Sequence, residues 1–162
     1  RVAKQKKLHV TCSVSAHHLT LTDDELQSFN GNVKVLPPLR TKKDTEALIA
    51  GVLDGSIDCI TSDHNPIDIE HKKVEFDHAK YGTIGLESLF GCLSTIFDFE
   101  TIVEGKEVAI SLFTSTEARA FSEKEILSTS KNSLFLGKES KGKVYGIYAN
   151  HELVLNEATL NL

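Results

Sequence analysis

The chain of 162 residues has little or nothing of several features that mark particular classes of protein. Its three cysteines are an odd number without Cys-x-x-Cys spacing, which excludes a disulfide framework and a zinc knuckle. No apolar run approaches the roughly 20 residues that a membrane-spanning helix needs. The basic N-terminal residues precede no apolar segment, so they are not a secretory signal peptide. We therefore expect no membrane segment.

Basic residues are also in the minority. Lys and Arg number 18 against 23 Asp and Glu, so the net charge is −5. No Lys/Arg stripe with interleaved aromatic residues occurs, which argues against a nucleic-acid partner. The motifs G-x-G-x-x-G, P-loop, G-x-S-x-G and H-E-x-x-H are absent as well. The common nucleotide-binding, serine-hydrolase and metalloprotease signatures are thereby excluded.

Each of the three cysteines, Cys12, Cys59 and Cys92, lies in an apolar strand or helix pattern. Such thiols are typically buried and reduced. Reduced thiols suit the cytoplasm, which is the location we expect.

Residues 8–62 alternate between strand-like and helix-like segments. Residues 8–14, 33–36 and 57–62 have strand patterns. Residues 41–54 predict a helix with an apolar stripe, because Thr41 with Asp44 three residues on is typical of a helix start. The order strand, helix, strand predicts an α/β fold with parallel strands and right-handed crossovers.

The C-terminal part changes character. Apolar residues recur at helical spacing over residues 86–97, and a second stripe over residues 108–113 predicts another helix, followed by a short turn that Thr116 caps. Residues 133–136, 144–148 and 152–155 are short β-like runs separated by turn residues. We predict a division into residues 1–121 and an accessory β unit over residues 122–162.

The most informative stretch lies between the third predicted strand and the helix after it. Asp63 directly follows a buried strand, and about twenty polar residues separate it from Gly82 and Gly85. An acid at that place suits a site at the C-terminal face of a parallel sheet. The alternative is an aspartate that only caps the strand end.

Three blocks of sequence resemble the dihydroorotase family of the amidohydrolase superfamily. They are VTCSVSAHHLTLTDDEL, then VKVLPPLRTKKDTEALIAGVLDGSIDCI, then SDHNP followed by FDHAKYGTIGLESLF. The blocks come in the family's order and spacing. The resemblance implies about the last three strands of a (β/α)₈ TIM barrel with their helices. It begins past the middle of the family's fold, and the chain has no methionine, even at residue 1. Both observations predict a C-terminal segment of a longer protein.

The resemblance also implies roles for particular residues. Asp63 would be a zinc ligand and the general base, and His64 would orient it. Backbone groups around Tyr81 and Gly82 would bind the substrate. His17 and His18 would not bind metal, because adjacent residues of an extended strand point to opposite faces. Zinc needs about three protein ligands, so the remaining ligands would lie outside this chain, and the segment alone would be inactive.

The resemblance implies a zinc-dependent hydrolase of cyclic amides that interconverts N-carbamoyl-aspartate and dihydroorotate in pyrimidine biosynthesis. Two positions depart from the family pattern: Leu36 replaces an asparagine and Ile67 replaces a histidine, both of which help bind the pyrimidine. Ser13 and Ala16 depart as well. The alternative is therefore a non-catalytic homologue that acts as a scaffold for a partner such as a carbamoyltransferase. Because three barrel strands leave two open edges, we also expect a homo-oligomer or a missing N-terminal portion.

Overall fold

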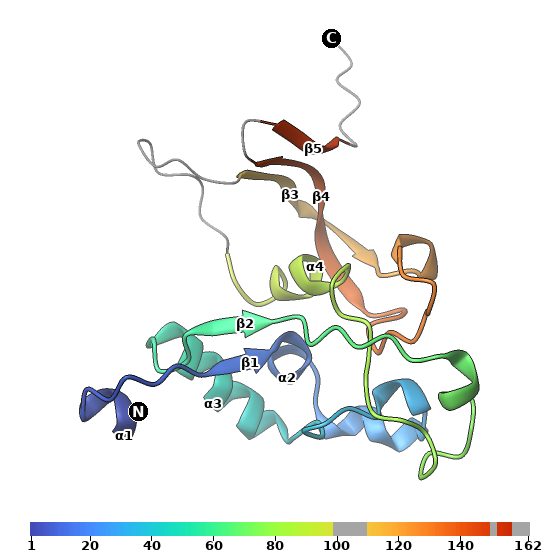
Figure 1. Ribbon diagram of the computed structural model, residues 1–162, viewed down its shortest axis with the longest axis horizontal. Coiled ribbons are helices and arrows are strands. Elements are labelled where there is room, and N and C mark those ends of the chain that lie inside the picture. Colours follow the sequence, from blue (N-terminus) through green and yellow to red (C-terminus); the bar gives the residue numbers. More distant parts are fainter. Residues whose placement is uncertain (99–109, 150–151, 157–162) are drawn as a thin grey trace.

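A computed structural model describes residues 1–98, 110–149 and 152–156 (Figure 1). Strands β1 (Ser13–Ser15) and β2 (Cys59–Thr61) pair in parallel, with Val14 opposite Ile60. This confirms the predicted α/β character and the parallel pairing. The connection between them contains α2 (Ala16–Thr20), the 3-10 turns η1 (Asp23–Ser28) and η2 (Gly31–Val33), and α3 (Lys42–Leu53); a short helix α1 (Val2–Gln5) precedes β1.

Helix α3 begins where its sequence predicts. The Thr41 hydroxyl accepts a hydrogen bond from the Asp44 backbone N–H at 3.4 Å, and the Asp44 carboxylate accepts one from the Thr41 N–H at 3.1 Å. This reciprocal capping box satisfies two donors that the first helical turn would otherwise leave open. The apolar stripe of the helix, Leu48, Ile49 and Val52, packs against the core. The predicted helix over residues 41–54 is thus confirmed.

A second, antiparallel sheet has the order β3 (Ile110–Ala120), β4 (Glu139–Ala149), β5 (Glu152–Asn156). Helix α4 (Leu89–Leu93) lies between the two sheets (Figure 1) and packs on the first residues of β4. Gly91 makes this approach possible, because a Cβ atom there would lie 1.9 Å from the Ser140 hydroxyl. The short helical turns η3 (Ile69–His71) and η4 (Glu123–Glu125) lie in the connections.

One apolar core joins the α2–α3 layer to α4 and the turns after β3. Its buried members are Val14, Ala16, Leu19, Leu21, Val33, Val35, Leu39, Ile84, Cys92, Leu93, Phe121, Ile126, Leu134 and Phe135. The helix predicted over residues 86–97 contributes to this core, although α4 is shorter than its apolar pattern.

Several predicted elements are wrong. Residues 33–36 form no strand, because the Lys34 carbonyl accepts from Gly82 N–H, outside any ladder, and the segment ends at a cis Leu36–Pro37 bond. Residues 110–113 belong to β3 and not to a helix, and Thr116 lies inside that strand; residues 108 and 109 lie outside the described residues. Residues 133–136 form a buried turn, whereas β4 and β5 contain the other two predicted runs.

The cysteine prediction is correct for only one residue. Cys92 is buried in the core, whereas Cys12, just before β1, and Cys59, in β2, are exposed. All three are free thiols. Sequence patterns show which residues are apolar enough to be buried, but not whether a neighbouring strand covers them.

In the described part of the chain, no helix combines the length and apolarity required to cross a membrane. The division at residue 121 stays a prediction, although β3 shares its sheet with β4 and β5.

Candidate active site

Asp63 follows the C-terminal end of β2, two residues after the last strand residue. Its backbone has φ 47°, the left-handed conformation that aspartate tolerates better than most residues. The neighbouring His64 forms a parallel bridge to Thr83, which holds the start of the long loop beside its end. The Asp63 side chain is 47% exposed, so a ligand approaching this end of the sheet can reach the carboxylate.

His17 lies on the inner side of Asp63. Its ring is fully buried, and Nε2 is 3.8 Å from the Asp63 carboxylate oxygen Oδ2. Burial, with a smaller contribution from His18, lowers the pKa of His17 to about 3. The imidazole is therefore neutral at pH 7, and the contact with Asp63 is not an ion pair.

The expected extended conformation of the two histidines is wrong. Both lie on helix α2, where their rings tilt against each other with centroids 4.4 Å apart. The Ser15 hydroxyl lies between them, 3.1 Å from His17 Nε2 and 2.6 Å from His18 Nδ1. His18 Nε2 lies 3.0 Å from the Pro37 carbonyl oxygen and 3.2 Å from that of Pro38. The two rings are thus held by packing and hydrogen bonds beside Asp63.

His64 holds the far end of the loop. Its Nδ1 accepts from the backbone N–H groups of Gly85 and Leu86, at 3.4 and 3.2 Å, and lies 3.9 Å from the Glu87 carboxylate. The other Glu87 oxygen accepts from Leu127 and Ser128 N–H. This arrangement ties the segment after β2 to the segment after β3. The predicted role of His64 in orienting Asp63 stays a prediction.

Gly82 has φ 135°, a region that only glycine occupies with ease. A Cβ atom there would lie 2.6 Å from the Asn65 side-chain nitrogen, and the Gly82 N–H donates to the Lys34 carbonyl at 3.0 Å. Close packing of its own loop therefore requires this glycine. Tyr81 is half exposed, and the Lys34 ammonium lies 4.9 Å from its ring centroid.

Asn132 is the residue that sequence reasoning missed. It is buried, and its amide accepts from Ile67 N–H at 3.0 Å and donates to the carbonyls of Asn65 and Gly82 at 3.4 Å. Its backbone carbonyl accepts from Ile84 N–H. Asn132 thus fastens both ends of the loop that follows Asp63. No motif surrounds it, so its sequence context carries no signal of this role.

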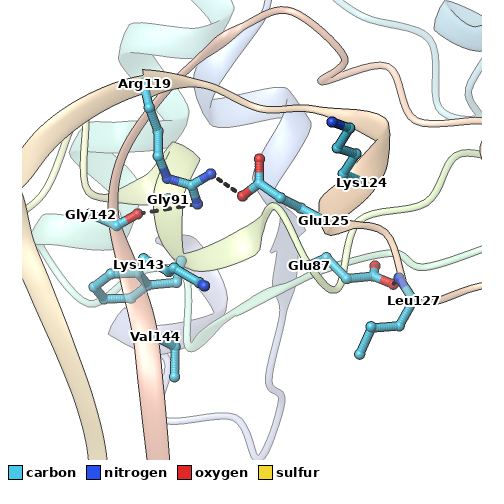
Figure 2. Close-up of a pocket in the computed structure, with 10 residues that line it drawn as sticks. Glu87, Gly91, Arg119, Lys124, Glu125, Leu127, Gly142, Lys143 and Val144 are labelled. Carbon is cyan, nitrogen blue, oxygen red and sulfur yellow. Dashed lines mark hydrogen bonds and ion pairs between the residues drawn. The ribbon is translucent and has the colours of Figure 1, made fainter. Parts of the chain in front are cut away.

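Another group of charges lines a cavity between α4 and the antiparallel sheet. Figure 2 shows this cavity of about 290 Å³, in which the Arg119 guanidinium pairs with Glu125 and approaches the Gly142 carbonyl at 3.5 Å. Arg119 and Glu125 already pair with each other, so the cavity is better explained as packing between α4 and the antiparallel sheet.

Known proteins with sequences similar to this chain include dihydroorotases. No protein-family model matches the chain. A dihydroorotase of Caldicellulosiruptor saccharolyticus is 36% identical over 186 aligned positions, which cover 99% of this chain and 43% of that protein. A dihydroorotase of Elusimicrobium minutum is 34% identical, with 99% and 43% covered. This chain is dihydroorotase-like in sequence.

Solved structures agree on the fold. The L-hydantoinase (dihydropyrimidinase) of Arthrobacter aurescens superposes with a TM-score of 0.83 at 18% identity, over 99% of this chain and 42% of that one. A D-hydantoinase superposes with a TM-score of 0.72 at 20% identity. The dihydroorotase-like segment spans about two fifths of the length of the proteins it matches.

The described residues do not fit a zinc site on their own. Across residues 1–98, 110–149 and 152–156, no three His, Cys, Asp or Glu side chains gather where they could hold a metal ion. Asp63 offers this dihydroorotase-like segment a single carboxylate at the strand end, and zinc in proteins takes about three protein ligands.

Proposed function

We propose that the chain is the C-terminal part of a (β/α)₈-barrel dihydroorotase. Such an enzyme opens the cyclic amide of dihydroorotate to give N-carbamoyl-aspartate, or closes it in the reverse direction, in pyrimidine biosynthesis. One observation carries the proposal: Asp63 stands partly exposed at the C-terminal end of a parallel strand, in a chain 36% identical to a dihydroorotase. Active sites of parallel α/β barrels lie at that end of the strands.

Asp63 is the residue we assign to proton transfer. Closing or opening a cyclic amide needs a group that takes a proton from the attacking oxygen and returns it to the leaving nitrogen. A carboxylate that is accessible on one side and contacted by a neutral imidazole on the other is placed to do both. The backbone around Tyr81 and Gly82 is the proposed substrate contact, and His64 the proposed support of Asp63.

Zinc is the proposed cofactor, with its other ligands outside this chain. It would supply a nucleophilic oxygen by lowering the pKa of bound water. We further propose a cytoplasmic homo-oligomer. The segment alone is proposed to be inactive.

The test is hydrolysis of dihydroorotate by the full-length protein and two matched variants. Asp63→Asn keeps the size of the side chain and an oxygen atom but cannot hold the proton. We expect its kcat to fall by about 10²–10⁴-fold, the usual contribution of an acid–base group. Asp68→Asn, on the exposed loop nearby, serves as the control and should leave kcat unchanged. Full turnover by Asp63→Asn would exclude this residue as the proton-transfer group.

A second function, a non-catalytic scaffold that binds a carbamoyltransferase, is favoured by Leu36 and Ile67. Leu36 is 65% exposed, and Ile67 is half-buried. Neither side chain can form a hydrogen bond with a polar ring. Each unpaired polar group of a buried substrate costs about 1–3 kcal/mol.

Calorimetric titration with dihydroorotate separates the two functions. If only substrate recognition has been lost, Leu36→Asn combined with Ile67→His should restore about 2–6 kcal/mol of binding, twice the cost per group. That range corresponds to a gain of about 30-fold to about 20,000-fold in affinity. Tight binding by the unmutated protein would remove the argument for a scaffold, and no binding by either form would support it.

A further inference from the structure

The donors and acceptors in the hydrogen bonds around Ser15 can be assigned from the two carbonyl groups that face His18. His18 Nε2 faces two carbonyl oxygens, those of Pro37 and Pro38, at 3.0 and 3.2 Å. A carbonyl oxygen only accepts, so His18 Nε2 must carry a proton. In a neutral imidazole the other nitrogen, Nδ1, is then an acceptor, and it takes the Ser15 hydroxyl proton across 2.6 Å.

Because the Ser15 hydroxyl donates its hydrogen bond to His18, its oxygen can only accept a hydrogen bond from another group. The group that lies 3.1 Å from it on the other side is His17 Nε2, which must therefore carry a proton and donate. A second observation agrees. Nε2 is also the atom 3.8 Å from the Asp63 carboxylate, and an N–H group facing an anion is favourable where a lone pair would be repelled.

His17 Nδ1 has no hydrogen-bond partner among the described residues, although it is buried. This is expected if Nε2 holds the only ring proton, because an unpaired acceptor costs less than an unpaired N–H donor. The 3.8 Å contact is longer than a hydrogen bond, as contacts of catalytic groups often are before substrate is bound.

We propose that His17 is the positioning residue of Asp63: its Nε2–H, which Ser15 and His18 fix on that nitrogen, is donated to the Ser15 oxygen and shared with the Asp63 carboxylate on the same side of the ring. This rests on the proposed function in so far as Asp63 transfers a proton. The same chain of contacts connects Asp63 to the Pro37–Pro38 turn, directly after Leu36. The turn that would flank the substrate and the carboxylate that would act on it are thus linked through three side chains.

The first test is independent of activity. Long-range ¹H–¹⁵N NMR of the full-length protein labelled at histidine reports which ring nitrogen carries the proton. We expect His17 in the Nε2–H form, a loss of this single form in Ser15→Ala, and a shifted Nε2 signal in Asp63→Asn but not in Asp68→Asn. A charged His18 would donate to Ser15, reverse the direction of these hydrogen bonds and leave the proton of His17 on Nδ1. A proton on Nδ1 of His17 would overturn the proposal. So would an Nε2 signal that ignores Asp63→Asn.

The second test is kinetic and uses two amides of different reach. Glutamine at position 17 places its N–H₂ near the position of Nε2, whereas asparagine places it near Nδ1. We expect His17→Gln to keep kcat within about threefold and His17→Asn to lower it about 10–100-fold with little change in KM, the pattern of a misplaced catalytic group. Equal kcat values for the two variants would contradict a positioning role.

The two tests separate the failure of this proposal from that of the proposed function. If the unmutated protein hydrolyses no cyclic amide, the proposed function fails, and the NMR measurements alone decide whether Nε2–H of His17 faces Asp63. If His17→Asn does not fold, Ser15→Ala still answers whether the hydroxyl fixes the ring proton.

Discussion

Lys72 is a buried lysine whose ammonium group joins three separate parts of the chain. Its Nζ donates to the carbonyls of Gly31 at 2.9 Å, Lys80 at 2.8 Å and Lys34 at 3.4 Å. Lys34 reaches back to the carbonyls of Phe76 and Asp77, both at 2.8 Å. These bonds fix the loop that leads to Tyr81 and Gly82, so the proposed substrate contact depends on two lysines that are structural.

We predict that Lys72→Met lowers the free energy of unfolding by about 1–3 kcal/mol at pH 7, since buried carbonyl oxygens lose their donor. Lys73→Met, one residue on and exposed, is the control and should change it by less than about 0.5 kcal/mol. Urea unfolding followed by circular dichroism measures both. Equal stability of the two variants would show that the carbonyls find other partners.

The same variant gives a pH dependence. Burial, and then the charge of Lys34, lower the pKa of Lys72 from 10.5 to about 8. Between these two values the unfolded chain binds a proton that the folded chain does not, so the folded state gains stability as the pH rises. The stability of the unmutated protein relative to Lys72→Met should therefore grow from pH 8 toward 10.5, by at most about 1.4 kcal/mol per pH unit. A constant difference would contradict the lowered pKa.

At the residue scale, the sequence was informative where chemistry depends on position along the chain. Asp63 could be placed because it follows a strand pattern directly and precedes a proline. Asn132 and Lys72 could not, because their roles are set by carbonyl groups far away in the sequence. A polar residue that satisfies buried backbone groups has no periodicity, and its function is visible only once the chain has folded.

At the scale of elements, α3 depends on its cap. We predict that Thr41→Ala destabilises the protein by about 1 kcal/mol, since it removes the acceptor for the Asp44 N–H. Thr41→Ser keeps the hydroxyl and should stay within a few tenths of a kcal/mol of the unmutated protein. Thermal unfolding monitored by circular dichroism compares them, and indistinguishable midpoints for both variants would show that the cap contributes nothing.

Elements that are determined by neighbouring residues in the sequence were predicted well. Elements that depend on pairing with a distant segment were not. The cap of α3 lies within four residues, so the sequence places that helix correctly. Residues 110–113 have a helix-like apolar pattern, yet in β3 they are paired with residues 144–148 of β4. Val33 and Val35 are buried, as their apolar pattern predicts, but Lys34 between them is buried too and the neighbouring segment offers no ladder. Apolar spacing thus showed which side chains enter the core and not which backbone would pair.

For the whole molecule, the β1–β2 pair is the feature that requires explanation. Two isolated parallel strands are marginal in water, and parallel sheets are normally covered on both faces. Here Cys59 of β2 is exposed, as are Val10 and Cys12 in the segment that leads into β1. In the proposed barrel, neighbouring strands would cover them. The two exposed cysteines and buried Cys92 therefore form a natural set of probes for that cover.

We predict that maleimide modifies Cys12 and Cys59 rapidly in the 162-residue chain and slowly in the full-length protein. Cys92 should react slowly in both, because it is buried and its pKa is raised to about 12, so almost no thiolate is present. It serves as the internal control for folding. Peptide mass spectrometry after a timed reaction assigns each site. If Cys12 and Cys59 react equally fast in both forms, the surfaces around these two cysteines remain open in the full-length protein, and the barrel proposed from the dihydroorotase relatives does not close there.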